Sequence, residues 1–269
     1  MTRRIGLAPL TALELSPPDL VSVAAEAGYD FVGLRLVPVV GQPYQHQIDV
    51  AAIKNRVAAT GMKVVDVEVF RLDPDTRVAD FDRMLAAAAL LGATDLLAHG
   101  ADPDESRLVD NWGQLCELAS AYGIAANLEP MPWLEVGTVA KAERLLDRTP
   151  RANAAVLVDP IHFFRGENRL EDLSGTKTRY VQFCDARAEK PTSMDEIRRQ
   201  AREDRLMPGE GNLDLHGFLE ALPPDLPISL EIPYAKPMPA LERAKLAIMT
   251  TRQLLTGLAP SSGHIGYRG

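Results

Sequence analysis

Residues 154–164 read AAVLVDPIHFF, so an apolar run leads directly into Asp159, and His162 follows three positions later. The run predicts a buried strand, because short apolar segments of this kind are typical of parallel strands covered on both faces. A carboxylate at the carboxyl end of such a strand is typical of active sites in parallel α/β proteins. It is also typical of a turn or a helix cap, so this stretch alone leaves both interpretations open.

Three further apolar segments in the second half of the chain repeat this pattern. Each places oxygen-bearing side chains near its carboxyl end: Glu129 in ANLEP (126–130), Gln182 and Asp185 in YVQFCDA (180–186), and Glu231 in PISLEIP (227–233). The repetition favours a functional site over four unrelated turns, because the carboxyl ends of parallel strands meet at one edge of a sheet.

Apolar periodicity and helix-end signals divide the chain into eight alternations of strand and helix. Strands are predicted at 4–8, 31–37, 63–70, 95–98, 124–128, 154–158, 179–184 and 227–231. Helices are predicted at 18–27, 48–60, 77–91, 105–122, 138–148, 215–221 and 240–255, with short helices near 170–173 and 194–203. Alternating strands and helices imply a parallel sheet.

A closed barrel explains this alternation better than an open sheet. Gly28, Gly61, Gly92 and Gly123 follow one another at intervals of 33, 31 and 31 residues, which is about one strand–helix unit. Eight such units fill about 250 residues. We therefore predict the α/β class and a single-domain (β/α)8 TIM barrel over residues 1–258, followed by a flexible tail at 259–269.

Composition and missing motifs exclude several classes of protein. There is no GxGxxG after the first strand, no GxxxxGK[ST] and no GxSxG. A net charge of −8 argues against a nucleic-acid partner. Cys116 and Cys184 are too few for a disulfide framework, and the proline-broken N-terminus is neither a signal peptide nor a membrane span. We expect a cytoplasmic protein with no membrane partner.

The predicted barrel brings several polar side chains to one mouth. At or just after the carboxyl ends of its strands lie Arg35, Glu68, His99, Glu129, Asp159, His162, Gln182, Asp185 and Glu231. Bare carboxylates so close together repel one another, and a divalent cation between them is the simplest resolution. An oxygen-rich set suits Mn²⁺ or Mg²⁺ better than a structural Zn²⁺ site, which prefers Cys and His.

The chain resembles the xylose-isomerase-like TIM barrel superfamily of sugar isomerases, epimerases and related metal-dependent enzymes. The motifs that carry the resemblance are NLEP at 127–130, LVDPIH at 157–162, VQFCDA at 181–186, PGEGNLDL at 208–215 and ISLEIP at 228–233. The resemblance implies one divalent ion, Mn²⁺ or Mg²⁺ with Co²⁺ or Zn²⁺ as alternatives, held by Glu129, Asp159, Gln182 and Glu231. Gln182 stands where many relatives have His, and a Gln at this position resembles the 3-dehydroshikimate dehydratase branch.

The expected function is isomerisation or epimerisation of a small sugar or polyhydroxy-ketone through an enediolate. Glu129 and Glu231 form the natural pair to remove and return a proton next to the carbonyl. The expected substrate contacts are His162, which we place at the rim, Arg205, which resembles a substrate-contacting residue of relatives, and His99, Glu68 and Arg35. Glu68 and Arg35 are equally explained by an ion pair across adjacent strands, and His99 by a structural hydrogen bond.

Other functions and roles stay open at this stage. The first alternative is a dehydratase of the 3-dehydroshikimate or inosose type, and the second is a barrel that binds a metabolite without catalysis. A DNA-repair phosphodiesterase is disfavoured, because it needs more metal ligands and a basic face. We interpret the charged run 195–205 as a solvated helix apart from Arg205, and Asp185 as a supporting or capping residue. A homo-oligomer is neither required nor excluded.

Overall fold

Short parallel strands joined by helices curl into a ring in the computed structural model, which describes residues 3–39 and 44–257. The strands are β1 (Ile5–Leu7), β2 (Phe31–Arg35), β3 (Val64–Leu72), β4 (Asp95–Gly100), β5 (Ala125–Leu128), β6 (Ala154–Val156), β7 (Val181–Phe183) and β8 (Ile228–Leu230). The α-helices are α1 (Pro17–Ala27), α2 (Val50–Thr60), α3 (Asp82–Leu90), α4 (Glu105–Ala121), α5 (Val139–Arg148), α6 (Pro160–Arg165), α7 (Met194–Glu203), α8 (Leu215–Glu220) and α9 (Ala240–Gly257). Short 3₁₀ helices are η1 (Pro9–Ala12), η2 (Val78–Phe81) and η3 (Leu170–Leu173).

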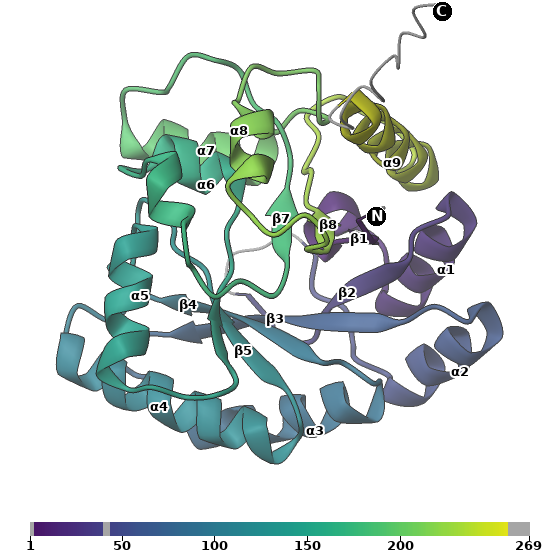
Figure 1. Cartoon of the computed structure of the whole chain (residues 1–269). Helices are drawn as coiled ribbons and strands as arrows, with labels where there is room; N and C mark the ends of the chain where they lie inside the picture. Colours follow the sequence, from purple (N-terminus) through teal and green to yellow (C-terminus); the bar gives the residue numbers. More distant parts are fainter. Residues whose placement is uncertain (1–2, 40–43, 258–269) are drawn as a thin grey trace, which may run out of the picture.

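The strands form one parallel sheet whose order confirms the predicted barrel. The order is β6-β5-β4-β3-β2-β1-β8-β7, so β1 and β8, which are far apart in sequence, are neighbours. A parallel bridge between Val158 and Val181 joins the two ends of this order, just beyond β6. The helices follow one another around the outside of the ring (Figure 1). The tail predicted at 259–269 lies outside the described residues.

Local sequence signals place the helix ends. The Ser16 side chain accepts a hydrogen bond from the Asp19 amide at the start of α1, and Gly28 ends the helix with φ 82°. A side chain is strained at such a positive φ, whereas glycine adopts it freely. Gly61, Gly92 and Gly123 also have positive φ, so the glycine recurrence marks real helix ends. No helix in the described part of the chain is both long and apolar enough to cross a bilayer.

Two segments differ from the predicted elements. The segment predicted as one helix from residue 77 begins with the 3₁₀ turn η2 before α3. The residues after Asp159, where no helix is predicted, form helix α6, with Asp159 as its N-cap and Pro160 in its first turn. Proline is favoured there because its fixed φ suits a helix and its missing N–H would have no helical partner. This local signal was present in the sequence.

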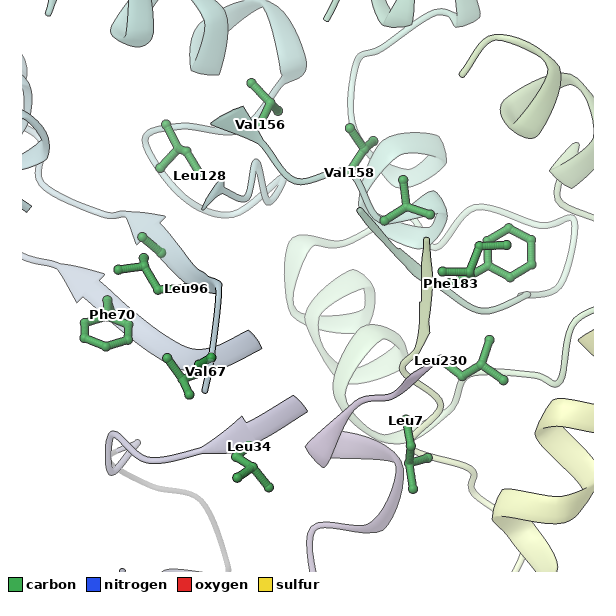
Figure 2. Packing of buried hydrophobic residues seen from close by; sticks show 14 of the residues in the cluster. Leu7, Leu34, Val67, Phe70, Leu96, Leu128, Val156, Val158, Phe183 and Leu230 are labelled. Atoms are coloured by element: carbon green, nitrogen blue, oxygen red, sulfur yellow. The ribbon is translucent and has the colours of Figure 1, made fainter. Parts of the chain in front are cut away.

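The main apolar core lies between the strands and the helices. Alternate strand residues such as Leu34, Leu96, Leu128 and Leu230 are buried together with apolar residues of the surrounding helices. Figure 2 shows the labelled side chains of successive strands following one another around the ring. Burial of this outer layer is the principal favourable term for the barrel, since apolar area removed from water stabilises the folded state.

The opposite strand faces line the interior, which is much more polar. A separate small cluster of Val69, Leu97, Leu157 and Tyr180 supplies its apolar packing. Asp66 is completely buried, and its carboxylate lies over Gly33 of β2, where a Cβ would approach Oδ1 to 2.7 Å. Burial raises the pKa of Asp66 well above its usual value, and the charges of Glu68 and Asp95 add to this.

We expect Asp66→Asn to stabilise the protein at pH 7 and to flatten the dependence of its stability on pH. The raised pKa means that the folded state keeps a proton that the unfolded chain loses above about pH 4. The free energy of unfolding of the parent should therefore fall as pH rises from 4 to 7, by at most about 1.4 kcal/mol per pH unit from this group. Urea unfolding at pH 5, 6 and 7 measures it. Asp110→Asn, an exposed change on α4, is the control; parallel curves for parent and Asp66→Asn would refute the expectation.

Candidate active site and metal centre

The two-residue period of the strands turns the predicted site residues inward. In β4, Leu96 belongs to the outer core, so His99 lies on the interior face. In the same way, Glu129 follows the outward Leu128, and Glu231 follows the outward Leu230. Arg35, Glu68, Asp159 and Gln182 obey the same alternation, so the predicted site residues from these strands meet inside one end of the barrel.

These side chains surround a cavity of about 600 Å³. Of the predicted site residues, its lining includes Arg35, Glu68, His99, Glu129, His162, Arg205 and Glu231. Asp159 and Gln182 lie behind this lining and contact it through Arg205 and Glu231. The volume suits a small metabolite, since ligand pockets typically span about 300–1,000 Å³.

One half of the site is built on Glu129. Its Oε2 lies 2.8 Å from His99 Nε2, and its Oε1 lies 3.7 Å from His162 Nε2. Oε1 is buried and makes no hydrogen bond with the described residues. His162, expected at the rim, is instead only 4% exposed. Helix α6 explains the difference, because it turns His162 back onto the side of the helix that carries Asp159.

The other half is built on Arg205, which is 2% exposed and lies between two carboxylates. Its Nη1 donates to Asp159 Oδ2 at 2.6 Å, and its Nη2 lies 2.8 Å from Glu231 Oε2. Gln182 Nε2 donates to the other Glu231 oxygen at 2.9 Å, which leaves Gln182 Oε1 buried without a hydrogen-bond partner among the described residues. Asp159 also caps α6 through the Ile161 amide, so the cap and the site share one side chain.

Burial controls the protonation of this site. It lowers the pKa values of His99 and His162 to about 3, although the Asp159 carboxylate opposes this at His162. Both imidazoles are therefore neutral near pH 7. Burial also raises the pKa of Glu129, with the neighbouring Asp159 charge adding to the effect, and it raises the pKa of Glu231 to about 8 against the opposing charge of Arg205. A cation bound beside these carboxylates would stabilise their charged forms.

Glu129, Asp159 and His162 form a candidate metal-binding group. One ligand atom from each lies within 4.8 Å of the others, and all three residues are buried. Neutral imidazole and carboxylate oxygens are ligands of divalent ions, and the unpartnered Glu129 Oε1 and Gln182 Oε1 supply acceptors without a donor. The residues present therefore fit a divalent cation. Glu231, predicted as a fourth ligand, does not belong to this group, and Arg205 contacts both Glu231 and Asp159.

The alternatives for Arg35 and Glu68 combine in the structure. Arg35 Nε donates to Glu68 Oε1 at 3.0 Å, so the two residues form the ion pair across β2 and β3. Both also line the cavity, and Glu68 Oε2 is buried without a hydrogen-bond partner in the described chain. The pair therefore joins β2 to β3 and also faces a molecule bound in the cavity.

Asp185 organises the loop that contains the PGEG motif. Its two carboxylate oxygens accept hydrogen bonds from the amides of Ala186, Gly209, Gly211 and Leu213. At Gly211 a Cβ would lie 2.3 Å from both Asp185 Oδ1 and the Ala186 carbonyl oxygen, so only glycine fits this close approach. These contacts agree with the supporting role predicted for Asp185.

Sequence reasoning missed four arginines of the cavity wall, of which Arg77 lies just before η2. Arg71 follows Phe70 in β3, while Arg198 and Arg202 lie on α7, in the run interpreted as a solvated helix. The separation of four residues between Arg198 and Arg202 is a signal that they share one helix face. Trp133, from the loop after β5, lies against His162 with ring centroids 5.0 Å apart.

A barrel with carboxylates and neutral imidazoles gathered at the carboxyl ends of its strands defines a TIM barrel with a candidate metal site. The chain belongs to the xylose isomerase-like TIM barrel family, whose profile matches residues 21–254. The resemblance carried by the five sequence motifs is thereby confirmed.

Individual relatives are distant. The chain is 26% identical, over 222 residues and 75% of its length, to a 3-dehydroshikimate dehydratase of Pseudomonas aeruginosa, and this match spans only 33% of that protein. It is 28% identical over 118 residues to an inosose isomerase of Bacillus subtilis, covering 42% of this chain and 41% of the relative. A crystal structure of IOLI protein with a zinc atom is 21% identical, with a TM-score of 0.77 over 95% of this chain and 99% of that one, which shows the shared fold.

We expect Arg205→Met to lower the free energy of unfolding by about 3–5 kcal/mol, because it leaves two buried carboxylates without their cation. Urea unfolding of the ion-free protein measures this. Arg199→Met, which removes a half-exposed arginine paired with Glu196 on α7, is the control and should cost less than about 1 kcal/mol. Equal losses in the two variants would contradict the assigned role of Arg205.

Proposed function

We propose that this protein is a divalent-metal-dependent isomerase or epimerase of a small polyhydroxy-ketone. The observation that carries the proposal is the position of the Glu129, Asp159 and His162 group beside a second glutamate, Glu231, which shares the cavity wall with Glu129 and His162. Such a site offers a place for a cation and two groups that can hold a proton. Its relatives include proteins named as an isomerase and as dehydratases, which supports an enzyme of this superfamily.

Glu129, Asp159 and His162 would hold the ion, with the free Gln182 carbonyl oxygen next to Glu231 as a further ligand. A bound divalent ion supplies Lewis-acid chemistry, stabilising negative charge that develops on the oxygen of a substrate carbonyl. Two carboxylates, one amide oxygen and one imidazole suit Mn²⁺, Co²⁺ or Zn²⁺ at least as well as Mg²⁺.

The chain's own carboxylates would transfer the proton. One glutamate removes the proton from the carbon next to the carbonyl, and the C–H electron pair moves into the enediolate. The same proton then returns to the neighbouring carbon in an isomerisation, or the second glutamate delivers one to the opposite face in an epimerisation. Glu129 and Glu231 fit these roles because they reach the cavity from different strands, β5 and β8.

The remaining residues would orient the two glutamates and the substrate. His99 holds Glu129 Oε2 at 2.8 Å, which fixes the direction of this carboxylate, whereas His162 Nε2 lies 3.7 Å from Oε1, beyond hydrogen-bond distance. Arg205 holds Glu231 as His99 holds Glu129. Glu68 and Arg35 present a charged pair to substrate hydroxyl groups on the adjacent wall. Positioning of this kind contributes to catalysis by removing the entropy of alignment from the reacting step.

A dehydratase is the second candidate, and two Pseudomonas relatives favour it, since they are named as 3-dehydroshikimate dehydratases. The first proton transfer is the same. The enediolate then expels a β-hydroxyl group, which leaves as water after taking a proton from a protonated glutamate. The two reactions differ in mass balance: an isomer keeps the formula of the substrate, and a dehydration product lacks one water.

The ion is tested first by thermal unfolding of chelator-treated protein with Mn²⁺, Co²⁺, Zn²⁺ or Mg²⁺. We expect at least one ion to raise the melting temperature, because binding to the folded state alone stabilises it by mass action. Glu129→Gln and Asp159→Asn should abolish the shift. Glu210→Gln, an exposed change in the loop near Tyr234, should leave it intact. A parent protein that responds to no ion would remove the metal from the proposal.

Chemistry is tested by NMR in D₂O with the loaded protein and candidate ketones such as D-allulose, scyllo-inosose and 3-dehydroshikimate. We expect deuterium to enter the carbon next to the carbonyl of one ketone, and Glu129→Gln or Glu231→Gln to slow this at least about 100-fold. A product of unchanged formula supports the isomerase, and a product lacking water supports the dehydratase. Exchange at the parental rate in both variants would exclude the glutamate pair.

A further inference from the structure

The mouth of the cavity carries a group of arginines that the proposed chemistry does not use. Arg71 from β3 and Arg198 and Arg202 from α7 all belong to the cavity wall. The two α7 residues are four positions apart, so one face of this helix presents both guanidinium groups to the cavity. A neutral sugar offers no anionic partner for these guanidinium groups.

Most charges at this mouth are already paired. Arg71 donates to Asp73 at 2.8 Å, Arg198 to Asp195 at 3.4 Å, and Arg77 lies 3.1 Å from Asp80. Asp75 is an exposed acid of the same wall. Arg202 differs from the other three arginines, because it makes no hydrogen bond or ion pair with any residue of the described ranges 3–39 and 44–257.

Trp133 adds a second donor without a partner. Its indole Nε1 is buried and makes no hydrogen bond in the described chain, although an indole N–H is a donor that normally finds an acceptor. The Arg198 guanidinium lies over the Trp133 ring, 6.0 Å from the centroid, and the same ring lies against His162. Trp133 therefore connects the arginine group directly to the candidate metal site.

The electrostatics of Arg202 agree with this description. Burial lowers the pKa of Arg202, and the positive charges of Arg198 and Arg71 lower it further. The charge of Arg202 also acts to lower the pKa values of His99 and His162. Its guanidinium is thus close enough to influence the cavity floor, and a bound anion would relieve the repulsion among the three arginines.

The cavity is divided by hydrogen-bonding character. Acceptors without donors lie on its floor, at Glu129 Oε1, Gln182 Oε1 and Glu68 Oε2. Two donors of the wall have no protein acceptor among the described residues: the buried Trp133 Nε1 and the guanidinium of Arg202, which is exposed at the mouth. The floor therefore suits a cation and hydroxyl groups, whereas the mouth suits an oxyanion.

We propose that Arg202 and Trp133 Nε1, with Arg198 and Arg71 beside them, form an anion subsite, so that the substrate is a polyhydroxy-ketone bearing a carboxylate or a phosphate group. This inference deepens the proposed function and rests on the same cavity. Guanidinium groups bind both anions through charge-assisted hydrogen bonds, so the chemistry of the subsite admits either one.

The test compares matched anionic and neutral compounds by isothermal titration calorimetry. Shikimate against methyl shikimate reports on a carboxylate, and D-fructose 6-phosphate against D-fructose reports on a phosphate. We expect the parent to bind the anion of at least one pair about tenfold or more tightly than its neutral partner, as one charge-assisted hydrogen bond provides. Arg202→Gln should reduce this preference to threefold or less, and Arg202→Lys should retain part of it.

Arg199→Gln is the matched control, because Arg199 is the third arginine of the same helix segment but does not line the cavity. It should keep the parental preference. Equal binding of both members in both pairs, no binding of either anion at 10 mM, or a preference that survives Arg202→Gln would each overturn the subsite.

The titrations are run with chelator-treated and with Mn²⁺-loaded protein, which separates this inference from the proposed chemistry. An anion preference without any response to metal keeps the subsite and removes the metal mechanism. A metal response without an anion preference removes the subsite alone.

Discussion

The site depends on the buried guanidinium of Arg205. It lies between Asp159 from the end of β6 and Glu231 from the end of β8, at 2.6 and 2.8 Å, and its Nε donates to the Ala201 carbonyl oxygen of α7. Taking two carboxylates out of water is costly unless a cation with good geometry compensates them. Arg205 provides that compensation, and the chain beyond β7 is arranged so that its side chain can reach both acids.

The barrel tolerates such charges because it separates apolar packing from polar function. Burial between strands and helices supplies most of the stability, and it uses one of the two faces of every strand. The other face is free for Glu68, Glu129, Gln182 and Glu231, with only a small apolar cluster around Tyr180 to pack it. Asp66 shows what this division costs, since its buried carboxyl has no hydrogen-bond partner among the described residues.

Loops complete what the strands begin. Asp185 fixes three backbone amides of the PGEG loop, those of Gly209, Gly211 and Leu213, and helix α6 places His162 against Glu129. Trp133 then connects the metal-ligand candidates to Arg198 of α7. Segments that follow β3, β5, β6 and β7 therefore meet over one cavity, although these segments are far apart in sequence.

The sequence by itself determined the barrel and the inward residues of its strands. Strand alternation has a period of two, and the glycines that end helices require positive φ, so both signals are local and survive without tertiary information. Glu129, Asp159, Gln182 and Glu231 could be predicted for that reason. The role of Asp159 as the N-cap of α6 also has a local sequence signal, because Pro160 directly follows it.

Tertiary structure alone decided which side chains pair. Arg205 contacts both Asp159 and Glu231, whereas Glu129 lies beside His99 and His162. These pairings depend on distances across the ring, and no spacing in the sequence predicts them. Arg198 and Arg202 lie in the run interpreted as a solvated helix, and Arg202 is indeed exposed. Periodicity gives the helix face that the two residues share but not the cavity that this face borders. Closure of the ring, which joins Val158 to Val181, brings that face over the cavity.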